Sequence, residues 1–266
     1  MTATIKHTGK VILAAAGCGD PELITVKAVR WLQQADIVLT DRLVSENILK
    51  EYVQPGVEII YVGKQNNKVA SVLQEDINQL LLKYALQGKL VVRLKGGDIA
   101  FFSNVLDELQ MLIDNNIPFE IIPGVTAASG AAAYAGIPLT AREYATSVRF
   151  LTCYKTDILT NEYWAELAAT ADTMVFYMSS ETLDTIVENL TAHKIDAAKL
   201  LAVVEQATTP QQNVSICNLY EYETTLKGKT FASPTLVIIG KVVSLHNKFA
   251  WQQNIDTNEL YFKPVG

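Results

Sequence analysis

The sequence is poor in cysteine and histidine, and this limits the chemistry that it can support. Its 266 residues include three cysteines and three histidines. The cysteines (Cys18, Cys153 and Cys217) are widely separated and odd in number, so they make neither a disulfide framework nor a metal knuckle. The histidines are equally scattered. We therefore predict reduced thiols and no His/Cys metal site.

The chain also lacks long apolar runs and an excess of positive charge. No stretch approaches the roughly 18 apolar residues that a membrane helix requires. The N-terminal segment lacks the apolar core of a signal peptide, which predicts a cytoplasmic protein that makes no use of a membrane. The formal net charge of −6 argues against a general nucleic-acid surface. An anionic small molecule would need a local basic cluster.

Apolar, β-branched runs alternate with longer helical patterns through the first half of the chain. Strands are predicted near residues 11–16, 36–40, 58–62, 90–94 and 119–122. Helices are predicted between them, near residues 22–34, 45–52, 72–87 and 104–115. This alternation is typical of a mostly parallel α/β sheet with helices on both faces.

A break at Pro123-Gly124 precedes a run of small residues, 125–136 (VTAASGAAAYAG). This run predicts either a closely packed helix or a chain that lies directly against a ligand. From residue 147 a second series begins, with strands near 148–152, 173–178, 200–204, 214–218 and 235–243 and helices near 161–169, 181–191 and 197–201. Two strand-like runs and a turn between residues 214 and 235 indicate a mixed α/β domain.

Length and composition fit two domains of moderate size. With 49% hydrophobic residues, the chain can bury one large core or two modest ones. We predict an N-terminal α/β domain over residues 9–124, a C-terminal α/β domain over 125–250, and a polar tail over 251–266. The composition of the tail predicts that it lies loosely on the surface.

Five motifs carry glycine, proline or charge at predicted strand ends. They are Gly17-Cys18-Gly19-Asp20, Asp41-Arg42, Val62-Gly63-Lys64, Gly96-Gly97-Asp98 and Pro123-Gly124-Val125-Thr126-Ala127. The first is not the dinucleotide pattern GxGxxG, because no third glycine follows. Strand ends of an open α/β sheet share one edge, so we expect these motifs to converge there and form a binding site.

These motifs resemble the tetrapyrrole methylase family, together with VVRLKGGD (91–98), AAAYAGIPLT (131–140), Tyr177-Met178 and SPTLVIIGKVV (233–243). The similarity runs from about residue 9 to residue 249. It points to the branch that methylates uroporphyrinogen III at two ring carbons to give precorrin-2. The resemblance implies a two-domain α/β protein, usually a homodimer, that binds S-adenosylmethionine between its domains and releases S-adenosylhomocysteine.

The resemblance also implies which residues contact the cofactor. They are Cys18, Gly96, Gly97, Asp98, Phe101, Thr126, Ala127, Met178 and Ala207. Glycine allows a close backbone approach, Asp98 is able to bind a polar group, and Met178 is able to pack against adenine. Alternatives stay open, because the glycines could serve turns and Met178 could lie in the core. Cys18 is either a reactive thiol or a buried, inert one.

Asp41 and Lys64 match the residues that the family uses as general base and general acid. Methyl transfer needs mainly alignment, but a proton must later leave the macrocycle, so a nearby carboxylate is useful. Asp41 could instead form an ion pair or a helix cap with Arg42. Lys64 could instead face substrate carboxylates. Arg42, Arg142 and Arg149 are further candidates to bind those carboxylates.

The sequence departs from the family pattern at several positions that should face the tetrapyrrole. Cys18 replaces a proline, Ala141 a common histidine and Cys153-Tyr154 a glycine-histidine pair. Residues 65–69 (QNNKV) and 99–106 (IAFFSNVL) replace segments in which the family has arginine and glycine. We expect a uroporphyrinogen-III C-methyltransferase of sirohaem or cobalamin synthesis. The alternatives are a methylase of another tetrapyrrole, such as a later precorrin, or a cofactor-binding paralogue with weak or lost catalysis.

Overall fold

The computed structural model describes residues 8–62, 74–153, 159–255, 257 and 259–262. Contacts within the chain divide it into two compact units. The first unit runs to Thr126 and takes in Phe262, and the second is Ala127–Tyr261. None of the described helices is both long enough and apolar enough to cross a membrane.

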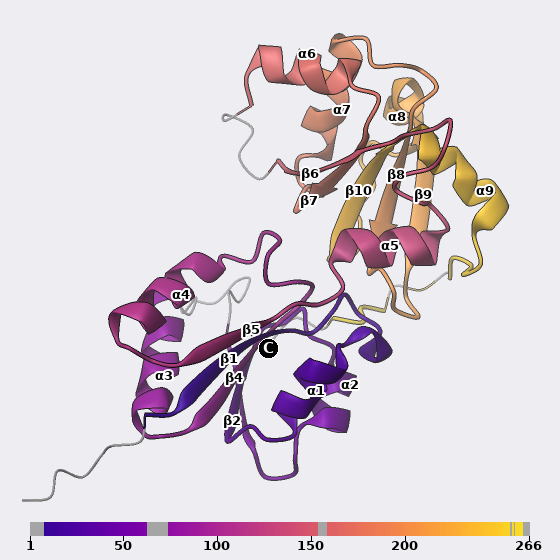
Figure 1. The fold of residues 1–266 in the computed structure, drawn as a ribbon. Coiled ribbons are helices and arrows are strands. Elements are labelled where there is room, and N and C mark those ends of the chain that lie inside the picture. Colours follow the sequence, from indigo (N-terminus) through magenta and orange to yellow (C-terminus); the bar gives the residue numbers. More distant parts are fainter. Residues whose placement is uncertain (1–7, 63–73, 154–158, 256, 258, 263–266) are drawn as a thin grey trace, which may run out of the picture. The chain divides into compact units, whose positions relative to one another are not determined.

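The described part of the first unit forms a parallel sheet with helices on both faces (Figure 1). Its strands are β1 (Lys10–Ala15), β2 (Ile37–Thr40), β3 (Glu58–Tyr61), β4 (Leu90–Lys95) and β5 (Phe119–Ile122). They lie in the order β3-β2-β4-β1-β5, and all neighbours are parallel. One face is covered by α1 (Val26–Leu32) and α2 (Glu46–Tyr52), and the other by α3 (Gln74–Leu86) and α4 (Val105–Asp114). The predicted parallel α/β sheet is confirmed.

The side chains of β1 show why helices are needed on both faces. Ile12 and Ala14 belong to the apolar core under α1 and α2, whereas Val11 and Leu13 belong to the core under α3 and α4. All four are fully buried. A strand buried on both faces is apolar at every position, which is the pattern that the sequence has here.

The predicted helix over residues 22–34 is wrong in one respect, because its first residues do not continue into α1. Pro21–Leu23 forms a short 3₁₀ turn, and the following backbone is extended at Thr25. The Thr25 hydroxyl then accepts a hydrogen bond from Ala28 N at 3.2 Å. A threonine in this position satisfies one of the amides that a helix start leaves without an intrahelical acceptor. The side chain therefore starts a separate helix.

The described part of the second unit forms a mixed sheet. Its strands are β6 (Val148–Thr152), β7 (Thr173–Tyr177), β8 (Leu200–Glu205), β9 (Asn213–Asn218) and β10 (Thr235–Gly240), in the order β6-β7-β10-β8-β9. Only the β6–β7 pair is parallel among these described strands. Its helices are α5 (Ala127–Ala135), α6 (Asn161–Ala169), α7 (Leu183–Ala192), α8 (Tyr222–Thr225) and α9 (His246–Phe249). α6 and α7 cover one face and α5 the other (Figure 1). The predicted mixed domain is confirmed.

Two local predictions for this unit are wrong. No helix forms over residues 197–201, because the Asp196 carboxylate accepts a hydrogen bond from Ala198 N at 2.9 Å and closes a turn. β8 begins directly afterwards, at Leu200. Of the two strand-like runs between residues 214 and 235, only the first becomes a strand, β9.

Helix α5 is built almost entirely from small residues, and it is the closely packed helix that the sequence offered as one alternative. Ala128, Gly130, Ala131 and Ala135 are all buried on it. The three alanines pack with Val175 of β7 and other apolar side chains on one face of the second sheet. Small side chains let the helix backbone approach the sheet closely, so this run is explained by packing.

The predicted loose tail is wrong for its first described residues. Asn254 binds the edge strand β9 through both ends of its side-chain amide: its Oδ1 accepts from Val214 N at 2.8 Å, and its Nδ2 donates to Val214 O at 2.9 Å. Gln252 Nε2 donates to Thr209 O at 2.8 Å. The tail therefore covers backbone groups that an edge strand would otherwise leave to solvent.

We predict that Asn254→Ala exposes the Val214 amide and destabilises the second unit by about 1 kcal/mol, the net value of a typical hydrogen bond. Hydrogen exchange followed by mass spectrometry should show faster exchange at β9, and urea unfolding should show the loss of stability. Gln253→Ala is the matched control, because the Gln253 side chain is exposed. Equal exchange at β9 in the wild type and Asn254→Ala would contradict the role of this amide.

Candidate functional site

The carboxyl ends of the parallel strands meet at one edge of the first sheet, and the turns that follow them bind to one another. Gly17 N, after β1, donates to Gly97 O at 3.1 Å, and Gly97 N, after β4, donates to Gly17 O at 2.6 Å. Gly97 has a φ of +74°, a conformation that favours glycine. Apart from Gly97 and its two chain neighbours, no described residue has an atom within 4 Å of the position that a Cβ on Gly97 would take. This side of the turn is open to a ligand.

Two carboxylates connect the other turns at this edge. Asp41, after β2, accepts from Gly96 N, at 3.4 Å to Oδ1 and 3.3 Å to Oδ2, and from Leu43 N at 3.0 Å to Oδ1. Asp98, after β4, accepts from Gly124 N at 2.7 Å. The turns after β1, β2, β4 and β5 are thus linked into one hydrogen-bonded surface.

The predicted convergence of strand-end motifs is confirmed for four of the five motifs. The fifth contains the predicted general acid, Lys64, which lies outside the described residues. Position 124 requires glycine for packing, because a Cβ there would lie 2.6 Å from Ala15 Cβ. Its missing side chain therefore lets neighbouring turns pack together, whereas a Cβ on Gly97 would meet no such neighbour.

Asp98 is 6% exposed, and both of its oxygens accept backbone hydrogen bonds. Besides the bond from Gly124, its Oδ1 accepts from Ala100 N at 2.8 Å. This carboxylate fixes the start of the loop between β4 and α4. Phe101 follows in that loop and is 38% exposed, and Thr126 is half-buried directly before α5.

In the second unit, the predicted cofactor residues gather at one edge of the sheet. Tyr177 at the end of β7 and Val204 near the end of β8 both pair with Leu236, so Met178 and Ala207 follow strands that end at the same edge. The Tyr177 hydroxyl accepts from Ala128 N at 3.1 Å, which brings the start of α5, with Ala127, to this edge.

Met178 and Ala207 differ in what they present at this edge. Met178 has a φ of +53° and is 51% exposed, so the alternative in which it is a core residue is wrong. Ala207 is buried, and it lies in a turn between two residues of positive φ, Gln206 and Thr208. Met178 therefore offers an apolar surface, and Ala207 offers a small side chain in a tightly wound backbone.

Arg149 does not lie at this edge. It pairs with Met174 in the β6–β7 register, several residues before the end of β7. Its Nε donates to Asp172 at 2.6 Å and a terminal nitrogen donates to Glu166 at 2.6 Å. Two carboxylates of its own unit therefore balance its charge, and this raises the pKa of the guanidinium. Arg142 lies elsewhere, exposed in the turn that follows Ala141.

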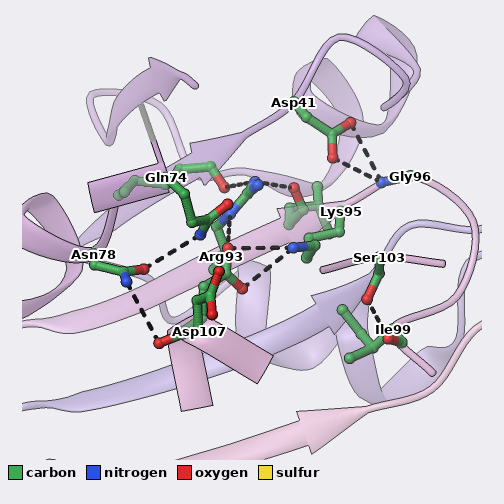
Figure 2. A network of polar contacts seen from close by, with 12 residues as sticks. Asp41, Gln74, Asn78, Arg93, Lys95, Gly96, Ile99, Ser103 and Asp107 are labelled. Carbon is green, nitrogen blue, oxygen red and sulfur yellow. Dashed lines mark hydrogen bonds and ion pairs between the residues drawn. The ribbon is translucent and has the colours of Figure 1, made fainter. Parts of the chain in front are cut away.

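A buried ion cluster lies in the first unit, near the carboxyl end of β4, and we did not predict it from the sequence. Arg93 and Lys95 of β4 both bind Glu108 of α4, with Arg93 Nε and Lys95 Nζ each 3.2 Å from Glu108 Oε1. Figure 2 shows this network beside Asp41 and Gly96. The signal was two cations, two residues apart, inside an otherwise apolar strand. Such a spacing puts both on one face, where a buried partner is required.

All three cysteines lie in the described part of the chain, and no disulfide joins them. Cys18 is buried beside the first glycine turn, as one of the two alternatives for it expected. Burial also raises the pKa of the Cys153 and Cys217 thiols, which disfavours their reactive thiolate forms. Among the described residues, no group of three or more His, Cys, Asp or Glu side chains is arranged to hold a metal ion.

Comparison with known proteins gives a consistent result. The family model of Tetrapyrrole (Corrin/Porphyrin) Methylases matches residues 10–223. The siroheme synthase of Azotobacter vinelandii is 46% identical over 249 residues, which are 94% of this chain and 53% of that protein. The chain therefore spans about half the length of the curated relatives that it matches.

Two solved structures are similar over most of their length. Uroporphyrin-III C-methyltransferase from Thermus thermophilus, complexed with S-adenosylhomocysteine, is 33% identical with a TM-score of 0.72, covering 88% of this chain and 93% of that chain. A cobalt precorrin-4 methyltransferase is 26% identical with a TM-score of 0.78, covering 88% of this chain and 95% of that chain.

The Arg149 network generates a prediction about pH and stability. Hydrogen bonds from Ser147 and Arg149 lower the pKa of Asp172 from 3.8 to about 2. Because the folded pKa is below the unfolded one, this stabilisation is complete above about pH 4 and is lost as the pH falls toward 2. Asp172→Asn should cost about 1 to 2 kcal/mol at neutral pH, and the difference from the wild type should shrink below pH 4 in denaturant unfolding.

Glu166→Gln is the matched control, because Glu166 binds the same guanidinium but its side chain is 58% exposed, against 18% for Asp172. An exposed ion pair contributes little, so this variant should lose less than half as much stability. A difference between Asp172→Asn and the wild type that is constant from pH 7 to pH 2 would contradict the assignment.

Proposed function

The chain belongs to the tetrapyrrole methylase family, and from this premise we propose that it transfers methyl groups from S-adenosylmethionine to two ring carbons of uroporphyrinogen III, giving precorrin-2 for sirohaem or cobalamin synthesis. The observation that carries the proposal is the linked set of strand-end turns around the open side of Gly97. It occurs in a chain 33% identical to a uroporphyrin-III C-methyltransferase that was solved with S-adenosylhomocysteine.

The described residues fit such a cofactor. S-adenosylmethionine has a flat apolar base, polar edges and a charged amino-acid end, and it supplies a methyl carbon made electrophilic by the adjoining sulfonium. Met178 offers an exposed apolar surface of the kind that packs against a base. The open side of Gly97 leaves room for a ligand beside the backbone in the first unit. We propose Ala127 and Ala207 as contacts contributed by the second unit. We propose Cys18, Gly96, Asp98, Phe101 and Thr126 as the remaining contacts.

We propose Asp41 as the general base that accepts the proton released from the methylated ring carbon. Backbone N–H groups of Leu43 and Gly96 hold its carboxylate in place. A carboxylate has about four lone-pair positions, so these donors leave acceptor capacity for the proton. Lys64 is proposed as the general acid or as a cation that faces substrate carboxylates.

Substrate recognition requires cations, because uroporphyrinogen carries eight carboxylates. Arg42, beside Asp41, and the exposed Arg142 are proposed to bind some of them. Arg149 is left out, because Asp172 and Glu166 already balance its charge. We also propose that the protein acts as a homodimer, as the family resemblance implies, and that it works in the cytoplasm.

A methylase of another tetrapyrrole, such as a later precorrin, is the second candidate. The similarity to a cobalt precorrin-4 methyltransferase, at a TM-score of 0.78, supports it. The replacement of family arginine and histidine positions in this sequence also favours a different set of substrate contacts.

The deciding experiment is an assay of methyl transfer. Purified protein is incubated with labelled S-adenosylmethionine and uroporphyrinogen III, and separately with later precorrins, and methyl incorporation is followed by mass spectrometry. We expect two methyl groups on uroporphyrinogen III. Incorporation only into a later precorrin would favour the second candidate. No incorporation into any tetrapyrrole, despite tight binding of S-adenosylhomocysteine in calorimetry, would leave the cofactor-binding paralogue.

For Asp41, we predict that Asp41→Asn lowers kcat by about 100-fold or more, the usual contribution of a general base. Binding of S-adenosylhomocysteine should stay within about threefold of the wild type. Asp36→Asn is a matched control, because Asp36 flanks the other end of β2 and its Oδ2 accepts from Leu90 N of β4 at 2.7 Å. It should reduce stability without this selective loss of kcat. Undiminished turnover in Asp41→Asn would rule out the base role.

A further inference from the structure

The three cofactor contacts proposed for the second unit belong to elements that are far apart in the sequence. Ala127 begins α5, Met178 follows β7 and Ala207 comes shortly after β8. Their spacing therefore depends on the bonds that join these elements. Tyr177, the last residue of β7, joins two of them, because its hydroxyl binds the start of α5 and its carbonyl binds the turn of Met178.

The Tyr177 hydroxyl caps α5 from another element of the fold. A helix leaves its first amides without intrahelical acceptors, and the Ala128 amide, the second in α5, donates to the Tyr177 hydroxyl at 3.1 Å. Tyr177 is 9% exposed and Ala128 is fully buried, so the bond is shielded from water. Ala127 is held at the same place, since a single peptide bond connects it to Ala128.

Packing fixes the direction of the Tyr177 ring. Tyr177 and Val175 of β7 both belong to the apolar core on the α5 face of the second sheet. Phe150 of β6 meets the Tyr177 ring edge to face, with ring centroids 6.1 Å apart and ring planes at 80°. A buried ring that is packed in this way keeps its hydroxyl at one position. The hydroxyl is therefore a fixed acceptor for the start of α5.

The backbone of Tyr177 holds the turn that carries Met178. Ser179 is fully buried, and its hydroxyl donates to the Tyr177 carbonyl oxygen at 2.8 Å, across Met178. Met178 has a positive φ in this turn, and its side chain is exposed. Tyr177 thus binds the segments that carry two of the proposed cofactor contacts.

We propose that Tyr177 is a positioning residue for S-adenosylmethionine: its hydroxyl sets the place of Ala127 relative to Met178, so that both residues contact the cofactor together. This inference rests on the proposed function, because it takes these two residues as cofactor contacts. Tyr177 acts through the Ala128 amide rather than through the ligand. A helix start that is already fixed loses little freedom on binding, which favours tight binding of the cofactor.

Two variants separate this role from a general contribution to folding. Tyr177→Phe removes the hydroxyl and keeps the ring, so it tests the hydrogen bond alone. Tyr222→Phe is the matched control, because Tyr222 is 5% exposed in the same unit and its hydroxyl donates to the Asp184 carboxylate. Tyr222 belongs to the core on the opposite face of the sheet, under α6 and α7. Circular dichroism and urea unfolding check that both variants fold.

The first readout is calorimetric binding of S-adenosylhomocysteine. We expect its Kd to rise about three- to tenfold in Tyr177→Phe, the effect of one typical hydrogen bond, and to stay within about twofold of the wild type in Tyr222→Phe. In the methyl-transfer assay, KM for S-adenosylmethionine should rise by a similar factor in Tyr177→Phe, while kcat at saturation stays within about twofold. A loss of folded protein would instead lower the apparent kcat and leave KM unchanged.

The second readout is hydrogen exchange followed by mass spectrometry, without ligand. Exchange at the start of α5 should be faster in Tyr177→Phe and unchanged in Tyr222→Phe. An unchanged Kd in Tyr177→Phe, with or without faster exchange there, would overturn the inference, and so would an equal rise of Kd in both variants. A wild type that binds S-adenosylhomocysteine but methylates no tetrapyrrole would instead overturn the proposed function, and the comparison of Kd values would still test the role of Tyr177.

Discussion

Backbone amides at the carboxyl ends of parallel strands need acceptors, because the ladder of strand hydrogen bonds stops there. In the first unit, Asp41 and Asp98 supply acceptors to Gly96 and Gly124, and Gly17 and Gly97 serve each other. Each turn is thus held by a turn from another strand. The rest of the candidate site depends on this arrangement, since its shape is established by bonds within the protein before any ligand binds.

This constraint also bears on the base role proposed for Asp41. Hydrogen bonds from the backbone N–H groups of Leu43 and Gly96 orient its carboxylate. Methyl transfer tolerates a weak base, because the electrophile is already activated and the proton leaves after the new bond forms. Orientation matters more in such a reaction than basicity.

The sequence predicted the fold where local patterns determine structure. The strand over 119–122 and the helix over 161–169 were predicted to the residue, because apolar spacing and flanking signals agree there. Two errors came from local bonds between a side chain and the backbone, at Thr25 and Asp196. Another arose where a side chain binds distant backbone, as Asn254 does with Val214. The partners of Arg149 and of the Arg93–Lys95–Glu108 cluster were not predicted, because they too lie on other elements of the fold. Sequence spacing shows that a charge is present, but not which partner from another element neutralises it.

The overall acidity of the chain does not oppose a polyanionic substrate. At physiological salt, charges more than about 8 Å apart in solvent are largely screened, so the net charge of −6 has little effect at a particular site. The charges within that distance determine the electrostatic potential at a site, and buried charges are screened least. Lys95 and Arg93 are buried with Glu108 in and beside the strand that leads into the turn carrying Gly96 and Gly97. Asp41 and Asp98 bind the turns at the same edge, so the edge carries charges of both signs and the net charge of the chain does not describe it.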